Sequence, residues 1–249
     1  MKLSTYIIAS NEETNIGDCI DSCLEISDEI ILVHNDCSDN TIEIAESKGA
    51  KIFKNEWVGY KEQKAFALSK CSGIWTLNLD ADERISRVLG DNIINFIKSV
   101  DNEVDIASFN RKSFFLGKWI NHGDWHPDEV KRLSRNGSAF WSGGNVHEYL
   151  DTKGRCIKLK GDLLHFSYKN LNDLVEKNLK YTDLYLIDKK QFNILPFFKV
   201  HILFRCFWRF FRCYIIKLGF LDGFPGFVIA ICSAFFVFLK YSKILLKSK

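Results

Sequence analysis

Two aspartates separated by a single residue, Asp80 and Asp82, form the pattern in this sequence that points most directly to chemistry. They follow an apolar run at residues 74–79, and alternate residues leaving a strand point the same way, so both carboxylates can reach one cation or one ribose. Mg²⁺ in proteins commonly takes one or two carboxylates together with phosphate oxygens of a substrate. The pattern therefore favours a diphosphate held through Mg²⁺ or Mn²⁺, with the metal neutralising the leaving group.

Two further polar clusters stand at equivalent places. Asn11 and Glu12 come shortly after an apolar run at residues 3–9, and Asp36 follows the run at 29–34, which ends in His34. Another run lies at 51–53, and segments with helical spacing at 11–26, 41–47, 60–69 and 88–99 alternate with the runs. This alternation predicts an α/β fold with a parallel sheet, helices on both faces and ligands beyond the carboxyl ends of the strands. The three clusters are therefore expected to form one site.

The glycines exclude two common nucleotide-binding loops. No GxGxxG follows the first predicted strand, and no GxxxxGK occurs in the sequence. The phosphate cradles of dinucleotide-binding and P-loop proteins are therefore missing. Carboxylates follow the first strand instead, and they can hold phosphate through a cation or accept hydrogen bonds from a base and a ribose.

The polar motifs stand in a defined order: Asn11-Glu12-Glu13, Asp36-Cys37-Ser38-Asp39, Trp57-Val58-Gly59-Tyr60, Asp80-Ala81-Asp82-Glu83, His126-Pro127-Asp128 and Val146-His147-Glu148. This order resembles glycosyltransferase family 2, in the branch of lipopolysaccharide-core β-glucosyltransferases, and the resemblance covers nearly the whole chain. It implies a GT-A type fold with a mostly parallel central sheet. It also implies a nucleotide-sugar donor, expected to be a UDP-hexose, together with a divalent metal and inversion at the anomeric carbon.

The same resemblance implies roles for individual residues. His34 stands where relatives usually carry an acid directly after the second strand, and Asp36 is the next acid. Other roles stay open: Arg132 could contact phosphate or pair with Asp128, and His165 could contact metal or be a core histidine. Donor binding is expected for Asn11, Glu12, His34, Asp36, Lys64, Asp80 and Arg132, and metal binding for Asp80, Asp82 and His165.

The second half of the chain is expected to supply the catalytic base. An inverting transfer needs one group that takes the proton from the acceptor hydroxyl as it attacks the sugar. Glu148, after the flexible Gly143-Gly144-Asn145 segment, is the first candidate, followed by Asp128 and then Asp124. The structural alternative for Glu148 is an ion pair with a surface lysine or arginine, which would contribute little to stability.

The C-terminal segment, residues 189–249, differs from the rest in charge. It carries eleven basic residues and one acid, Asp222, for a net charge of +10, whereas residues 1–188 carry 23 basic and 30 acidic residues, a net charge of −7. Residues 224–239 are apolar, but sixteen residues make a helix of roughly 24 Å, which is short of a bilayer core. Arg205, Arg209 and Arg212 share one face of a predicted helix, a pattern typical of attachment to an anionic membrane surface. A soluble helical cap or a dimer interface is the alternative, and nucleic-acid binding is not expected.

These observations predict two parts. Residues 1–188 form a GT-A domain, with a donor half at 1–100 and an acceptor half at 101–188, and residues 189–249 form a basic, aromatic-rich helical membrane-association region. The eight cysteines form no CxxC pair, which disfavours zinc and suits free thiols in the cytosol. We expect an inverting glycosyltransferase that acts on a lipid-linked glycan, such as lipopolysaccharide core, at the cytoplasmic face of the inner membrane. The alternatives are a nucleotidyltransferase on a sugar phosphate and a non-catalytic membrane-bound sugar-nucleotide-binding protein.

Overall fold

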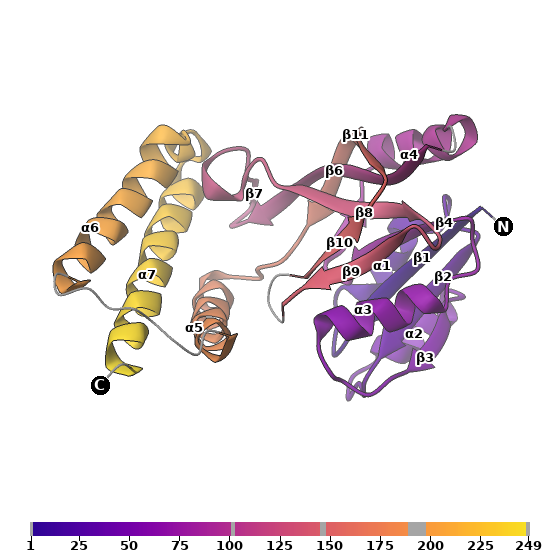
Figure 1. Ribbon diagram of the computed structural model, residues 1–249, viewed down its shortest axis with the longest axis horizontal. Coiled ribbons are helices and arrows are strands. Elements are labelled where there is room, and N and C mark those ends of the chain that lie inside the picture. The colour runs from indigo at the N-terminus through magenta and orange to yellow at the C-terminus, as the bar shows by residue number, and fades with distance from the viewer. Residues whose placement is uncertain (1, 101–102, 145–147, 189–197, 248–249) are drawn as a thin grey trace. The chain divides into compact units, whose positions relative to one another are not determined.

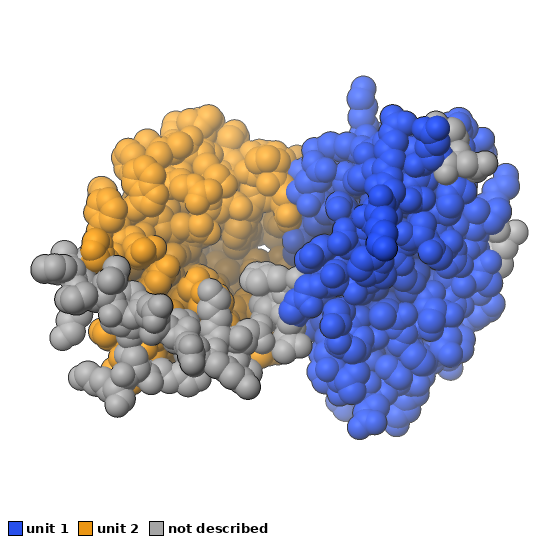
Figure 2. All heavy atoms as spheres, viewed as in Figure 1, with its two compact units in different colours: residues 1–111, 129–165 blue, residues 112–128, 166–249 orange. Residues whose placement is uncertain are grey.

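A computed structural model describes residues 2–100, 103–144, 148–188 and 198–247 (Figure 1). The chain divides into two compact units, shown in different colours in Figure 2. The sheet unit comprises residues 1–111 and 129–165, and the helical unit comprises residues 112–128 and 166–249. The helical unit thus includes a segment from the middle of the chain. The boundary predicted between residues 188 and 189 lies at the edge of residues 189–197, which are outside the described residues.

The main sheet runs in the order β3-β2-β1-β4-β8-β6-β11-β5. Strands β1 to β4 are parallel neighbours, as the βα alternation predicts, and β8 then pairs antiparallel with both β4 and β6. A separate antiparallel pair is formed by β9 and β10. The bounds are β1 Leu3–Ala9, β2 Glu29–His34, β3 Lys51–Lys54, β4 Trp75–Asp80, β5 Glu83–Ile85, β6 Val104–Phe115, β8 Glu129–Arg135, β9 Ala139–Gly143, β10 Glu148–Thr152 and β11 Arg155–His165.

Four helices connect or cover these strands: α1 Ile16–Cys23, α2 Thr41–Ser47, α3 Tyr60–Ser69 and α4 Arg87–Ser99. Helix α1 is shorter than the expected span of 11–26. Asn11 has a left-handed φ of 57°, and the Glu12 carbonyl accepts hydrogen bonds from the backbone N–H groups of Asn15 and Ile16. This turn delays the helix, and it places the Asn11–Glu12 cluster in a loop after β1.

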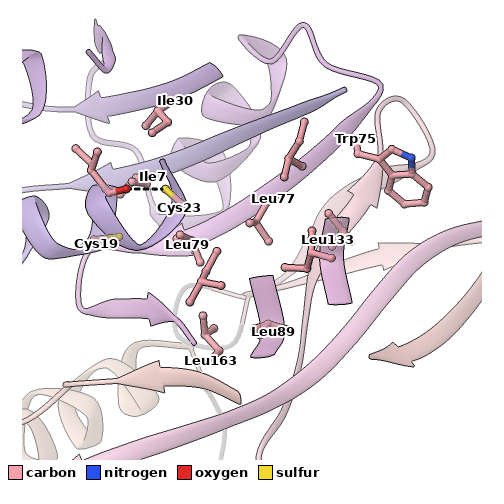
Figure 3. Close-up of a cluster of buried hydrophobic side chains, with 14 of the residues drawn as sticks. Ile7, Cys19, Cys23, Ile30, Trp75, Leu77, Leu79, Leu89, Leu133 and Leu163 are labelled. Atoms are coloured by element: carbon pink, nitrogen blue, oxygen red, sulfur yellow. Dashed lines mark hydrogen bonds between the residues drawn. The ribbon is translucent and has the colours of Figure 1, made fainter. Parts of the chain in front are cut away.

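The central strands are buried on both faces, and side-chain alternation sends their residues into two cores. Ile7 of β1 and Leu32 of β2 belong to the cluster that includes α1, whereas Tyr6 and Ile31 belong to the cluster that includes α3 and β9. Figure 3 shows the first cluster, with Ile7 and Leu79 beside α1. Full burial of each large aliphatic side chain contributes about 1.5–3 kcal/mol. The two cores fix the direction in which β1, β2 and β4 end.

The helical unit has a small core of its own, in which α7 packs against α5 and α6. Its elements are β7 Lys118–Trp119, a 3₁₀ turn Gly123–Trp125, α5 Leu171–Asp188, α6 Phe198–Phe211, a π-helical turn Arg212–Ile216, a 3₁₀ turn Gly219–Asp222 and α7 Phe224–Lys247. Among the described residues, one helix, α7, is long and apolar enough to cross a membrane by length and composition alone. Its 24 residues span about 36 Å, so the sequence-based length of 16 residues was too short. The helix continues past Leu239 through Lys240 and Lys243, and both lysines lie against other side chains of this unit.

Two buried carboxylates tie the middle segment to the C-terminal segment within the helical unit. Asp222 accepts hydrogen bonds from the backbone N–H groups of Asn121 and His122, at 3.1 and 2.8 Å. Asp124 lies 2.9 Å from Arg209 Nε and 3.0 Å from Lys217 Nζ. Arg209, one of the three arginines predicted to share a helix face, is therefore paired with a buried carboxylate, which is stabilised by a cationic partner. Asp124, the third candidate for the base, is engaged by these two cations.

Candidate active site

Asp80 is the last residue of β4 and lies between two cations. Its Oδ1 is 2.9 Å from Lys64 Nζ, and its Oδ2 is 2.5 Å from a terminal nitrogen of Arg132. Burial alone would raise the pKa of Asp80, but the charges of Arg132 and Lys64 outweigh it and hold this pKa well below its usual range. Asp80 is therefore ionised throughout the physiological pH range, and both of its oxygens contact cations.

Arg132, on β8, is buried and makes three short contacts. Besides Asp80, its guanidinium donates to Asn78 Oδ1 at 2.5 Å and to Glu83 Oε1 at 2.6 Å. Burial would lower the pKa of Arg132, but Asp80 and Glu83 raise it above its usual range. From the sequence, Asp128 was the alternative partner of Arg132. The observed partners are instead residues of the sheet unit, whereas Asp128 belongs to the helical unit. The guanidinium is occupied by protein groups rather than presented to a phosphate.

Lys64 links Asp80 to Glu148, the first candidate for the base. Its Nζ is 3.0 Å from Glu148 Oε1, and 4% of its side chain is exposed against 15% for Glu148. The same ammonium lies 4.8 Å from the centre of the Trp141 ring, whose Nε1 donates to the buried Tyr6 hydroxyl. Glu148 thus pairs with a lysine, as its structural alternative supposed, but this lysine is buried in the sheet unit and shared with Asp80.

These contacts continue into a line of six charges of alternating sign. Arg111, on β6, closes the line with a contact of 3.3 Å to Glu83. Each inner member touches an opposite charge on both sides, which is the arrangement that stabilises buried ions. We call this line the charge chain; its members, from six different elements, are Glu148, Lys64, Asp80, Arg132, Glu83 and Arg111.

Asp82 and His165 form a second pair, separate from the charge chain. Asp82 follows β4, His165 ends β11, and their Oδ2 and Nε2 atoms are 3.5 Å apart. Among the described residues no group of three or more His, Cys, Asp or Glu side chains could hold a metal. One carboxylate and one imidazole nevertheless fit a divalent cation that takes its remaining ligands from substrate phosphate and water. The geometry favours Asp82 and His165 over Asp80 as ligands, because both Asp80 oxygens already contact cations.

Hydrogen bonds connect the loop after β1 to the loop after β2. Asn11 Oδ1 accepts a hydrogen bond from the backbone N–H of Ser38, at 2.8 Å, and Glu12 N–H donates to Thr41 Oγ1, also at 2.8 Å. These contacts bring the first two predicted clusters together. Asp36 instead points to solvent and pairs with Lys54 at 2.5 Å.

His34 ends β2 and is 7% exposed. Its carbonyl accepts the backbone N–H of Asn55, whereas its buried Nδ1 has no hydrogen-bond partner within the described part of the chain. A buried polar atom without a partner carries an energetic cost, so such an atom is well suited to a ligand. The two predicted donor contacts after β2 thus differ: His34 is buried with an Nδ1 that is unpaired among the described residues, and Asp36 is exposed and paired with Lys54.

Two residues of this site had no role assigned from the sequence. Glu83 is fully buried, and its Oε2 accepts the backbone N–H of Asp80 at 3.0 Å. Tyr60 begins α3 one turn before Lys64; burial raises its pKa, as do the charges of Glu148, Asp80 and Glu12, so its hydroxyl lies among site carboxylates. The i, i+4 spacing of Tyr60 and Lys64 is a signal that could have placed both on one helix face. His147 of the quoted motif lies outside the described residues.

Comparison with known proteins identifies the family. A profile described as "Glycosyl transferase family 2" matches residues 4–156. An uncharacterized glycosyltransferase of Rickettsia typhi is 31% identical over 98% of this chain and 86% of its own length. A protein of Rhizobium meliloti named "Lipopolysaccharide core biosynthesis glycosyltransferase LpsC" is 29% identical over 98% of this chain and 92% of its own length.

Solved structures give a weaker likeness. Glucosyl-3-phosphoglycerate synthase of Mycobacterium tuberculosis, crystallised with Mn²⁺, UDP and glucosyl-3-phosphoglycerate, is 22% identical and covers 47% of this chain and 44% of its own, with a TM-score of 0.38. The family match and the sheet topology confirm the predicted fold class, a GT-A type α/β fold followed by an apolar C-terminal helix.

Proposed function

The chain belongs to glycosyltransferase family 2, and on that premise we propose that it moves a hexosyl group, with inversion, from a nucleotide-sugar donor to a lipid-linked glycan. The observation that carries the proposal is the contact of one buried lysine with both Asp80 and Glu148. Asp80 stands at the strand end where ligands of such sheets bind. Glu148 lies 84 residues beyond Lys64 and still reaches it, so the expected donor and acceptor halves meet at this lysine.

In the proposed reaction, Glu148 takes the proton from an acceptor hydroxyl. The hydroxyl oxygen forms a bond to the anomeric carbon while the bond from that carbon to the diphosphate breaks on the opposite face. The proton ends on the Glu148 carboxylate, and the electron pair leaves with the nucleoside diphosphate. One base suffices, in contrast to the paired carboxylates of glycosidases. Asp128 is the second candidate for this role.

Donor binding is assigned to the loops after β1 and β2 and to the end of β4. His34, whose buried Nδ1 has no partner among the described residues, is assigned to the nucleobase of the donor. Asn11 and Glu12 hold together the loops after β1 and β2. Asp82 and His165 are the residues that would hold Mg²⁺ or Mn²⁺. When bound, such a cation neutralises negative charge on the departing diphosphate.

The acceptor is proposed to be lipid-linked because the helical unit exposes much apolar surface. On α6, Leu203 and Phe207 are 70% and 64% exposed and stand one helical turn apart. Exposed apolar side chains that adjoin one another mark interaction surfaces in proteins. The exposed apolar residues of this unit include Leu203, Phe204, Phe207, Trp208, Phe211, Ile215, Ile216, Leu218, Phe220, Leu221, Phe224, Phe227, Ile231, Phe235 and Phe238.

The name of the Rhizobium meliloti relative also supports a lipopolysaccharide-type acceptor. We therefore place the protein at the cytoplasmic face of a membrane, where a sugar nucleotide and a lipid-linked glycan are both accessible. The net positive charge of residues 189–249 suits an anionic leaflet.

A product assay tests the proposal. The full chain is incubated with Mn²⁺, single nucleotide sugars and a glycolipid extract, and the released nucleotides are separated by chromatography. Release of a nucleoside diphosphate that depends on the extract supports glycosyl transfer. Release of pyrophosphate would indicate nucleotidyl transfer to a sugar phosphate, and donor binding without any product would indicate a non-catalytic protein.

A further inference from the structure

We propose that Lys64 is a positioning residue for the base: it holds Glu148 through Oε1 and leaves Oε2 as the oxygen that receives the acceptor's proton. The proposal rests on the proposed function, since it assumes that Glu148 acts as the base. It changes the role of Lys64 from the donor contact expected from the sequence to a residue that acts through Glu148.

The ammonium of Lys64 is held on three sides. It has three N–H donors, and its neighbours are Asp80 Oδ1 at 2.9 Å, Glu148 Oε1 at 3.0 Å and the Trp141 ring at 4.8 Å. With 4% of its side chain exposed, it lies inside the sheet unit rather than on a solvated helix face. Two of the three N–H donors are thus directed to carboxylates, and the third lies on the side of the Trp141 ring.

The position of the Lys64 ammonium is itself fixed by buried groups. Trp141 is 8% exposed, and its indole Nε1 donates to the hydroxyl of Tyr6, which lies on β1 with no exposed surface. Asp80 is held from the other side by Arg132 and by the rest of the charge chain. The ammonium therefore has one defined position relative to β1 and β4. Its contact with Glu148 fixes the position of that carboxylate relative to the same strands.

Glu148 needs such a link because of where it stands. It is the first residue of β10, and β10 pairs with β9 rather than with a strand of the main sheet. Within the described residues, Lys64 is the side-chain partner of Glu148, and the hydrogen bond between them is made through Oε1 rather than Oε2. A general base must lie within hydrogen-bond reach of the proton it takes, and a misplacement of about 1 Å can lower a rate by roughly 10²-fold.

The test compares three variants with the wild-type chain. Lys64→Met keeps the length of the side chain and removes the charge, Lys64→Arg keeps the charge, and Lys61→Met is the control. Lys61 lies on the same helix but is 39% exposed and pairs only with the adjacent Glu62 in the described structure. Donor affinity is measured by calorimetry, and kcat is measured at saturating donor.

A positioning role predicts that Lys64→Met lowers kcat by about 10- to 100-fold, the range of misplacement effects, while the donor Kd stays within about threefold. Lys64→Arg should recover part of kcat, and Lys61→Met should match the wild type. A tenfold or greater rise of the donor Kd in Lys64→Met, with kcat retained at saturation, would make Lys64 a diphosphate contact and overturn the proposal.

A double variant keeps the proposal testable if Lys64→Met folds poorly. Because Lys64 is proposed to act only through Glu148, Lys64→Arg should lower kcat in the wild-type background and leave it unchanged in the Glu148→Gln background. Equal losses in both backgrounds would contradict the proposal. Wild-type protein that binds no nucleotide sugar would instead contradict the proposed function, so the two failures are distinguishable.

Discussion

At the scale of single residues, Asp80, which ends β4, and Asp82, which follows it, have different partners. Asp80 is occupied on both oxygens by Lys64 and Arg132, whereas Asp82 faces His165 across 3.5 Å. A carboxylate that already balances two buried cations is a poor ligand for a third. We therefore propose the pair Asp82 and His165 as the place where a divalent cation and the donor diphosphate would meet.

The first prediction concerns this pair. Asp82→Asn should keep the fold and weaken Mn²⁺-dependent donor binding by at least about tenfold, because one anionic ligand is lost. Calorimetric titration of a nucleotide sugar with and without Mn²⁺ measures the effect. Asp91→Asn, an exposed position on α4, is the control. Unchanged Mn²⁺-dependent affinity in Asp82→Asn would remove the metal role from this residue.

The second prediction concerns stability at acid pH. Glu29, on β2, is 6% exposed and accepts hydrogen bonds from Lys51 Nζ at 2.7 Å and Ser4 Oγ at 2.6 Å. Burial acts to raise its pKa, but these partners, with Ser72, lower it to about 2. A lowered native pKa stabilises the fold above the unfolded-state pKa of about 4.5, and that contribution disappears as the pH falls towards 2.

The shift from 4.5 to about 2 corresponds to at most about 3.5 kcal/mol, since one pKa unit is about 1.4 kcal/mol. Wild-type protein should therefore lose stability between about pH 5 and pH 2 more steeply than Glu29→Gln. Denaturant unfolding at a series of pH values measures both curves. Parallel curves for the two proteins would show that Glu29 does not carry the effect.

At the scale of elements, the sequence predicted the donor half better than the acceptor half. Local apolar runs and turn residues define β1, β2 and α3, whose observed bounds agree with the expected ones. Helix α1 came out shorter because the left-handed Asn11 starts a turn, which apolar spacing does not reveal. The antiparallel insertion of β8 next to β4 depends on long-range pairing, which local periodicity cannot encode.

In the site, too, local patterns could be predicted from the sequence and long-range contacts could not. The local pattern at the end of β4 singled out Asp80 and Asp82, and the resemblance to a family added His165 as a candidate metal contact. The structure places His165 3.5 Å from Asp82, a contact that was not predicted. The contact of Lys64 with Glu148 joins residues 84 positions apart, and the sequence near either residue does not predict it. Arg132 was expected near phosphate, but two carboxylates and Asn78 hold it inside the sheet unit.

The third prediction tests the carboxylate that organises the helical unit. Asp222→Asn should destabilise this unit by about 2–4 kcal/mol, because a charged acceptor for several hydrogen bonds is lost from a buried position. Asp183→Asn is the control, since Asp183 is 64% exposed and pairs with Lys243 at the surface. Thermal unfolding in a mild detergent compares the two variants. Equal melting temperatures would show that Asp222 contributes no more than a surface pair.

At the scale of the whole molecule, the helical unit combines a basic composition with exposed apolar side chains. Part of its positive charge is neutralised by carboxylates of the same unit, because Arg209 and Lys217 contact Asp124, and Lys243 contacts Asp183. Attachment to a membrane should therefore depend on apolar insertion as well as on charge. This differs from an attachment that rests on basic residues alone.

The fourth prediction follows from that combination. Binding to anionic liposomes should weaken as salt rises, because surface charges are screened, and a fraction should persist at high salt through apolar contact. Exchanging Phe204 and Phe207 for serine should lower partitioning by at least about tenfold. Val88→Ser, an exposed apolar position in the sheet unit, is the control. Sedimentation that is independent of salt and of both phenylalanines would contradict this account of attachment.

The central claim is that Glu148, held beside Asp80 by Lys64, is the base of a glycosyl transfer. Its most direct test is the turnover of Glu148→Gln, which keeps the shape of the side chain and removes the proton acceptor. General-base assistance contributes about 10²–10⁴-fold, so kcat should fall by that factor while donor affinity stays within about threefold. A near-normal kcat in Glu148→Gln, together with a large loss in Asp128→Asn, would contradict the claim and make Asp128 the base.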